Sequence, residues 1–222
     1  MATVTPIFPL NTVVFPGMVL PLHIFEARYR HMMRDLMSLP EPEQRRFVVL
    51  AIRDGYEVGE FGSQSLYSTG TLVQLGDTQQ NPDGSLDIEV RAIARARVAT
   101  TQTGSDYLRG NTEIIPESTA TPPAELVNEA KALFQRYQGQ VHALSGFALY
   151  REPMPVSAVE LSFTLATSAL LPLPHKQCLL EESDVAQRLR LWGDYITEEL
   201  AAMRAIPSLP ATELARTRWS PN

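Results

Sequence analysis

The fold of this chain is decided by its opening stretch, which reads PIFPL at residues 6–10, VFPG at 14–17 and PLHIFEARYR at 21–30. No residue before Glu26 is charged, apart from His23 when it is protonated. Prolines at positions 6, 9, 16 and 21 exclude a continuous helix, because proline lacks the N–H donor and its ring clashes with the preceding turn. An uncharged segment that proline interrupts in this way predicts two buried, extended strands joined by a turn at residues 15–17.

The spacing of the apolar residues becomes helical directly after this stretch. Apolar side chains then recur in steps of three and four, at Phe25, Tyr29, Met32, Met33, Leu36 and Met37. Charged residues lie between them and fall on the opposite face. The pattern predicts an amphipathic helix over residues 25–38, which ends before Pro40.

Further strands follow in the first half of the chain. The continuous apolar run at 47–52 is typical of a strand that is buried on both faces. Asp83 and Gly84 supply the turn of a β-hairpin, in which a strand that begins at Gly70 is followed by a return strand over residues 85–100.

The return strand alternates between two kinds of residue. Small or branched apolar residues are expected on one face, and Glu89, Arg91, Arg95 and Arg97 on the other. Alanines on the inner face suit a tightly curved barrel. We therefore expect residues 1–117 to form a β pseudo-barrel in which the helix 25–38 is embedded.

The spacing is helical from residue 121 onward. Thr121 and Pro122 are suited to the start of a helix whose apolar stripe reaches Gly139. An almost wholly apolar helix begins at Ser157, and a last helix begins at Ser183 or Asp184. We expect a helical bundle over residues 121–206 and a loose tail over 207–222. Strands with one early helix, followed only by helices, define an α+β protein with segregated layers.

Several of these runs resemble a known family. FPL at 8–10, VVFPG at 13–17 and PLHIFEARY at 21–29 are similar to the start of the N-terminal substrate-binding domain of Lon proteases, which also occurs in cereblon and in small stand-alone bacterial proteins. The resemblance continues through GTLV at 70–73, PDGSLDI at 82–88 and KQCLLE at 176–181. It implies a bacterial, peptidase S16-like protein with a PUA-like β pseudo-barrel and a C-terminal α-helical bundle.

Composition indicates an ordinary globular protein of the cytoplasm. The 222 residues are 44% hydrophobic and 20% charged, and the net charge of −6 gives no general attraction for polyanions. The single cysteine, Cys178, excludes an intramolecular disulfide and points to a reduced compartment. The prolines of the opening stretch argue against a signal peptide, and the apolar region at 156–174 is too polar for a membrane span.

Catalysis is not expected in these residues. A phosphate-binding loop needs Gly-x-x-x-x-Gly-Lys-Ser/Thr, whereas the two lysines, Lys131 and Lys176, follow Ala130 and His175. The Ser–Lys peptidase of Lon belongs, by the resemblance, to a separate C-terminal domain. We therefore expect an ATP-independent protein with no catalytic residue and no cofactor.

A metal site is not expected either. His175 and Cys178 offer two ligands one helical turn apart, and a tetrahedral site needs three or four.

Two groups of residues are candidates for contacts with protein. Methionines near the opening stretch either fill the barrel core, which we favour, or line an adaptable apolar surface. Aromatic residues in the loop at 53–68 are suited to a contact rim. The resemblance adds two charged residues at the start of the first helix, Glu26 and Arg28. Without the resemblance, their expected role is structural, as contacts that hold the helix against the barrel. The candidates are Glu26, Arg28, Met32, Tyr56, Phe61 and Tyr67.

The predicted function is that of a non-catalytic module that binds peptides or partly unfolded proteins, as an adaptor for a client or a protease, without contact to a membrane. RNA binding through Arg91, Arg95 and Arg97 is the alternative, because PUA-type folds bind RNA. Three cations on an acidic protein, without aromatic residues between them, are better explained as a solvated strand face. Nucleic acid is therefore not an expected partner.

Overall fold

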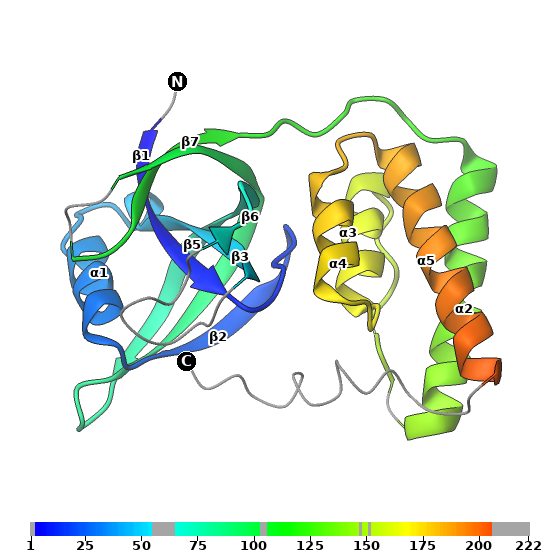
Figure 1. Ribbon diagram of the computed structural model, residues 1–222, viewed down its shortest axis with the longest axis horizontal. Coiled ribbons are helices and arrows are strands. Elements are labelled where there is room, and N and C mark those ends of the chain that lie inside the picture. The colour runs from blue at the N-terminus through cyan, green and yellow to red at the C-terminus, as the bar shows by residue number, and fades with distance from the viewer. Residues whose placement is uncertain (1–2, 55–64, 103–105, 147, 151, 206–222) are drawn as a thin grey trace. The chain divides into compact units, whose positions relative to one another are not determined.

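Figure 1 shows the computed structural model of the chain, which describes residues 3–54, 65–102, 106–146, 148–150 and 152–205. Contacts within the chain define two compact units, one up to Ile115 and one from Pro116 onward. The predicted domain limits, 1–117 and 121–206, stay predictions. Tyr56, Phe61 and the predicted tail at 207–222 lie outside the described residues.

The order of elements confirms the α+β class. The first unit contains β1 (Thr3–Leu10), β2 (Val19–Ile24), α1 (Ala27–Met37), the 3-10 helix η1 (Pro42–Gln44), β3 (Arg46–Asp54), β4 (Ser65–Leu66), β5 (Thr69–Gln80), β6 (Leu86–Gln102) and β7 (Arg109–Ile114). The second contains α2 (Ala124–Ser145), α3 (Ala158–Ser168), α4 (Leu173–Glu181) and α5 (Val185–Ala205). Among the described residues, no helix is long and apolar enough to cross a membrane.

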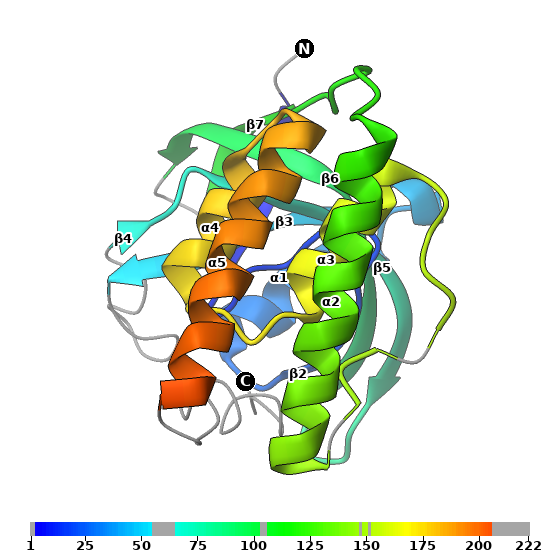
Figure 2. The same cartoon turned by 90° about the vertical axis from the view of Figure 1, so that its right-hand side faces the viewer.

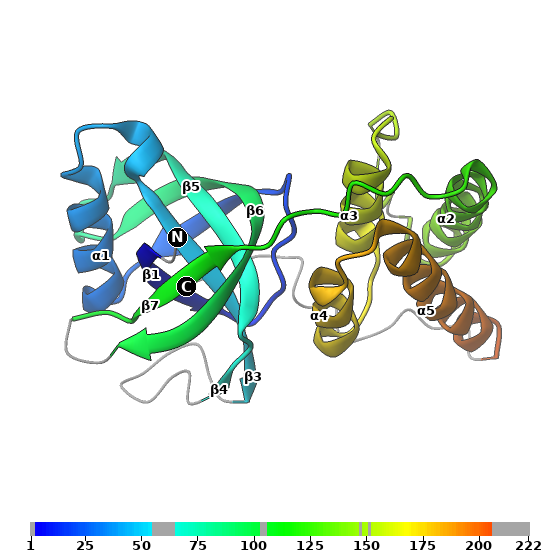
Figure 3. The ribbon, with the colours of Figure 1, turned by 90° about the horizontal axis from the view of Figure 1, so that it is seen from above.

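Strand β1 closes the sheet of the first unit, because it pairs along both of its edges. Residues 3–6 pair antiparallel with β7, and residues 7–10 pair parallel with β3. The strands follow one another in the order β1, β7, β6, β5 and β3, and the pairing of β3 with β1 completes a ring. Figure 3 shows this ring from above, with α1 beside it. Strand β2 pairs with β6 outside the ring path.

The main apolar core of this unit lies between α1 and the strands. The buried residues of α1 are Tyr29, Met32, Met33 and Leu36, and they belong to one cluster with side chains of β1, β3, β5 and β6. The ring of Phe8 in β1 lies 4.4 Å from the ring of Tyr29, centroid to centroid. Met32 and Met33 are completely buried, so they fill the core, as favoured from the sequence.

The predicted row of three arginines on one face of β6 is wrong. Val73 of β5 pairs with Ala92 of β6, and the residue before it in β5, Leu72, pairs with Ala94. β6 therefore carries one extra residue, Ile93, between the two pairs. Because paired residues point to the same side and neighbours in a strand point to opposite sides, this β-bulge reverses the facing of all later residues. Arg91 therefore lies on the opposite face from Arg95.

The bulge also explains why Arg95 is not on a solvated face. It pairs with Thr71, whose own side chain is buried and whose hydroxyl donates to the carbonyl oxygen of Val14 at 2.5 Å. The side chain of Arg95 is 0% exposed, whereas Arg91 and Arg97 are exposed. Its guanidinium is part of the interior.

Gly70 allows the close approach of β5 to β3. A Cβ atom at this position would lie 2.1 Å from the backbone oxygen of Val49 and 2.6 Å from Cδ2 of Leu50. Both contacts are far inside the van der Waals limit, and the backbone oxygen cannot move without disturbing β3. Gly70 is thus required by packing and not by a special backbone conformation.

Helix α2 of the second unit is longer than predicted. It starts at Ala124, after Pro123, and it passes through Gly139 to end at Ser145. The expected end at Gly139 is wrong because one glycine costs a helix only about 1 kcal/mol, and the apolar stripe continues to the buried Val141. Gly146, at φ 73°, ends the helix, and its N–H donates to the carbonyl oxygen of His142 at 2.8 Å.

Polar side chains fasten the buried helix α3 to its neighbours. Ser157 caps its start by accepting a hydrogen bond from the N–H of Glu160 at 3.4 Å, as predicted. Nε1 of Trp192 in α5 donates to the carbonyl oxygen of Leu165 at 3.1 Å. The hydroxyl of Tyr137 in α2 accepts the N–H of Leu170 just after α3 at 3.0 Å. Figure 2 shows α2 and α5, which pack on each other, in side view.

Arg188 of α5 is the buried centre of this unit. Its side chain is 0% exposed, and its guanidinium carbon lies 4.2 Å above the ring of Phe163. The guanidinium donates to the hydroxyl of Ser162 at 2.8 Å, to the carbonyl oxygen of Glu182 at 2.7 Å and to the carboxylate of Glu117 at 2.9 Å. One side chain thus joins α5, α3, the end of α4 and the segment before α2.

Replacing Gly70 with alanine is expected to destabilise the first unit by about 3 kcal/mol or more, because the added methyl group overpacks the β3–β5 contact. Urea unfolding followed by circular dichroism measures the effect. The matched control is Gly139→Ala, where a Cβ meets nothing within 4 Å on an exposed helix position; it should raise stability by roughly 0.5–1 kcal/mol. Equal stabilities for the two variants would contradict the packing role of Gly70.

Replacing Arg188 with alanine is expected to cost about 3–5 kcal/mol, since the change leaves buried polar partners unpaired and opens a cavity. Trp192 lies one turn away in α5 and reports the loss through its fluorescence during unfolding. Arg190→Ala, on the exposed face of the same helix, is the control and should stay within about 0.5 kcal/mol of the parent.

Candidate functional site

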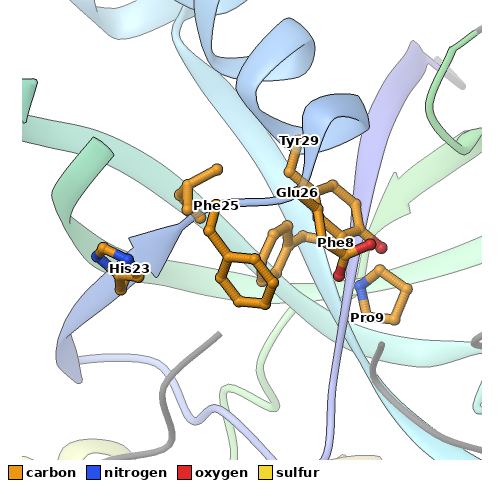
Figure 4. Close-up of a pocket in the computed structure, with 7 residues that line it drawn as sticks. Phe8, Pro9, His23, Phe25, Glu26 and Tyr29 are labelled. Atoms are coloured by element: carbon orange, nitrogen blue, oxygen red, sulfur yellow. The ribbon is translucent and has the colours of Figure 1, made fainter. Parts of the chain in front are cut away.

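The junction between β2 and α1 forms a small pocket in the first unit. Residues from β1, β2 and the start of α1 line it, and Figure 4 shows their side chains. They are Phe8, Pro9, His23, Ile24, Phe25, Glu26 and Tyr29. Two of the candidate residues predicted from the sequence lie at this junction, Glu26 in the lining and Arg28 in the first turn of α1.

The apolar part of the pocket combines a buried floor with one exposed ring. Phe8, Ile24 and Tyr29 are buried and belong to the core cluster, so the floor is held by the packing of the whole unit. Phe25 follows β2 and precedes α1, and its side chain is 40% exposed. An aromatic ring exposed beside a fixed apolar floor is a surface on which another apolar side chain gains by burial.

The charged part of the pocket is held by an ion pair. Nε and NH2 of Arg28 lie 2.9 and 2.8 Å from Oε2 of Glu26. The guanidinium carbon of Arg28 also lies 4.6 Å from the centre of the Tyr29 ring, and such a cation–π contact fixes the side chain. Both side chains are partly exposed, so the carboxylate of Glu26, which lines the pocket, is held in a set position by the guanidinium of Arg28.

A hydrogen-bonded contact between a histidine and a carboxylate borders the pocket on the side of β2. Nδ1 of His23 lies 2.6 Å from Oδ1 of Asp87 across the β2–β6 pairing, and the amide of Asn81 donates to Oδ2 of Asp87 at 2.9 Å. The hydrogen bonds from His23 and then Asn81 hold the pKa of Asp87 below its ordinary value. His23 also stacks near Phe25, with 6.2 Å between the ring centres, so this network orients the exposed ring.

The turn of the β5–β6 hairpin, next to Asp87, is also held by hydrogen bonds to a carboxylate. The hydroxyl and the N–H of Ser85 both donate to Oδ1 of Asp83, at 2.6 and 3.0 Å. These two bonds, that from the hydroxyl first, lower the pKa of Asp83. Arg30 of α1 reaches the turn and donates to the carbonyl oxygen of Gly84 at 3.3 Å. Hydrogen bonds thus connect the turn to α1 through Arg30, and β6 next to the turn to β2 through His23 and Asp87.

The other predicted candidates do not share this site in the described structure. Met32 is completely buried beneath α1 and is not accessible to a ligand. Tyr67 follows β4 and is half-buried, and its N–H donates to the carbonyl oxygen of Ala51 in β3 at 3.0 Å. Tyr56 and Phe61 lie outside the described residues.

The most exposed residue of the pocket was missed from the sequence. Phe25 fits the helical stripe by spacing, which predicts that it lies on the buried face of the helix 25–38. The helix begins only at Ala27, after an extended Glu26 at φ −66° and ψ 135°. The strand pattern contained the necessary information, because alternation from the buried Ile24 places the next residue on the outside.

The described residues offer no ligand set for a metal ion, since no group of three or more His, Cys, Asp or Glu side chains meets in them. His175 stacks instead on Tyr195, with 4.1 Å between the ring centres and 2° between the planes. The lining of the pocket combines apolar, aromatic and charged groups.

Comparison with known proteins defines the class of this chain. The family model for the substrate-binding domain of the ATP-dependent protease La (LON) matches residues 4–198. The chain belongs to this family, whose domain is non-catalytic.

Individual relatives agree with this. Lon protease 1 of Thermus thermophilus is 30% identical over 192 residues, which make up 83% of this chain and 23% of that protein. Lon protease of Escherichia coli is 25% identical over 187 residues, again 23% of its length. The chain thus spans about a quarter of the length of the curated relatives that it matches.

Solved structures have the same fold. The Lon N-terminal domain protein from Xanthomonas campestris superposes with a TM-score of 0.63 at 26% identity, over 85% of this chain and 95% of that one. The N-terminal domain of Lon protease from the Mycobacterium avium complex gives 0.59 at 20% identity, over 88% and 98%. The mixed α+β arrangement of strands and helices is therefore shared.

The hydrogen bonds to two carboxylates beside the pocket predict a specific dependence of stability on pH. Asp83 and Asp87 have lower pKa values in the folded chain than when unfolded, so their bonds stabilise the fold above pH about 4 and are lost as the pH falls through the folded pKa values. The double variant Asp83→Asn, Asp87→Asn should be less stable than the parent at pH 7 and approach it at pH 3. Urea midpoints at both pH values measure this, and a gap that does not change with pH would contradict it.

Proposed function

We propose that this chain binds peptides and partly unfolded proteins, without ATP and without catalysis, and that the pocket at the β2–α1 junction is part of the contact surface. The observation that carries the proposal is the match to a substrate-binding domain over residues 4–198. The exposed Phe25 beside a buried apolar floor supplies a physical basis for binding in these residues.

The proposed mode of binding follows from the chemistry of the pocket. A client that exposes an apolar side chain gains by covering Phe25, and the exposed ring at the pocket mouth acts as an anchor. Glu26 and Arg28 present opposite charges next to it and accept polar groups of a client backbone or side chain. A folded protein buries most of its large apolar side chains, so this surface favours unfolded chains.

We also propose a more detailed architecture than the mixed α+β fold that the chain shares with the solved structures. We propose that the strand ring of the first unit is a PUA-like pseudo-barrel and that α2 to α5 form a helical bundle. We also propose that the protein acts in the bacterial cytoplasm, as an adaptor that presents clients to a protease. The lone cysteine and the family of Lon proteases support this assignment.

RNA binding is not proposed for this chain. The three arginines that suggested it do not form one surface, because Arg95 is buried and Arg91 and Arg97 lie on opposite faces of β6.

Phe25→Ala is expected to weaken the binding of an unfolded protein by about tenfold, because the anchor loses most of its apolar area. A labelled, reduced and carboxymethylated serum albumin serves as the unfolded probe, and fluorescence anisotropy gives the affinity. Ile114→Ala in β7 is the matched control, since Ile114 is 52% exposed and lies outside the pocket. The proposal fails if the parent chain does not bind the probe, and the pocket assignment fails if both variants bind like the parent.

A further inference from the structure

One edge of β2 is without a pairing strand in the described part of the chain. β2 pairs with β6 along its other edge, from Val19 opposite Arg91 to Ile24 opposite Leu86. The edge strand borders the candidate pocket directly, because Ile24, its last residue, is followed by Phe25. A free edge and an apolar pocket are thus continuous.

The direction of the backbone groups along this edge follows from the pairing. The N–H of Ala92 donates to the carbonyl oxygen of Met18 at 2.8 Å, and in an antiparallel pair the bonded residues alternate. The backbone N–H and C=O groups of Leu20, Leu22 and Ile24 therefore bond to β6. The backbone groups of the alternate residues point away from β6, toward the free edge. Pro21 agrees independently, since proline, which has no N–H, is tolerated where that group would face the free edge.

The free edge therefore carries a defined row of donors and acceptors. The N–H groups of Val19 and His23 point outward, together with the carbonyl oxygens of Val19, Pro21 and His23. Such a row matches the backbone of another extended chain. Along one side of it, Leu20 and Leu22 face the core cluster but are only half-buried, so they leave an apolar shelf at the edge.

We propose that an extended segment of a client chain adds to β2 as a further strand, a step that rests on the proposed function and specifies it. Every second side chain of the segment then lies on the shelf beside Leu20 and Leu22, and one end reaches Phe25. The substrate class is therefore a segment of alternating apolar residues without proline. Folded proteins hold such segments inside their sheets, and unfolded chains expose them.

A second copy of this chain is a poorer occupant of the edge. Pro21 removes one donor from each of two edges that would have to satisfy one another. Asp87 and Glu89 of β6 lie opposite His23 and Pro21, and each copy has a net charge of −6, so two copies repel.

The test uses backbone methylation, which removes N–H donors and blocks one edge of a peptide. The probe is a fluorescein-labelled ten-residue peptide of alternating Val and Thr with Lys at both ends, in three forms. One is unmodified, and the others are N-methylated at alternate amides, on one edge or on the other. Strand addition predicts that one methylated peptide loses at least about tenfold in affinity while the other binds like the unmodified one. Equal affinities for both methylated peptides would overturn the proposal.

A pair of variants tests the same edge from the side of the protein. Val19→Pro removes an outward N–H without touching the bonds to β6, and it should weaken binding of the unmodified peptide by about tenfold. Val19→Ala shortens the side chain but keeps the N–H, so it should bind like the parent. Circular dichroism and the urea midpoint verify that each variant is folded, and Leu20→Ala, which shortens the shelf but keeps the edge donors, gives an independent loss if Val19→Pro does not fold.

These outcomes separate the edge from the proposed function. If the parent binds carboxymethylated albumin, but neither methylation nor Val19→Pro affects the binding of the peptide, the function stands and strand addition is wrong. If the parent does not bind the albumin, the function itself fails. Sedimentation of the parent as a dimer that Val19→Pro converts to a monomer would show that a second copy occupies the edge, and would also overturn the proposal.

Discussion

The first unit depends on a single strand that is paired on both sides. β1 bonds to β7 with its first half and to β3 with its second half, and this exchange of partners turns an open sheet into a ring. The second half of this strand, Ile7 to Leu10, is buried on both faces, and burial on both faces accounts for the absence of charge there. The same pairing holds the floor of the pocket in place, because Phe8 lies in β1 and packs on Tyr29 of α1.

Local patterns predicted those parts of the fold in which each residue follows the period of its element. The hairpin at Asp83-Gly84, the buried strand at 47–52 and the helix near 25–38 all appear, and Asp184 caps α5 by accepting the N–H of Gln187 at 2.8 Å. The bulge at Ile93 was not predicted, since one extra residue leaves the alternation of residue types intact while it reverses their facing.

The two buried arginines show different limits of sequence reasoning. Arg188 shares the helical stripe of Val185, Leu189 and Trp192, so its spacing indicated burial although its charge argued against it. Arg95 gave no such indication, because its burial depends on a change of register with β5. The ring closure was equally hidden, since pairing between β1 and β3 is set by tertiary contacts and leaves no local trace.

The site itself was only half predicted. Glu26 and Arg28 were named through a family resemblance, and the structure brings them together as an ion pair next to Tyr29. Phe25, which gives the pocket its exposed apolar surface, was hidden by a helical period that began two residues too early. A pocket that forms where the strand period changes to the helical period is difficult to predict from either period alone.

Pro21 has a consequence for the lifetime of any complex at the edge of β2. A strand that pairs there lacks one bond in the middle of its ladder, and each hydrogen bond contributes about 1 kcal/mol. The loss shortens the residence time of the bound segment by roughly fivefold if it appears in the dissociation rate. Under the proposed function, such a short residence time would suit a module that binds a client chain and then passes it on.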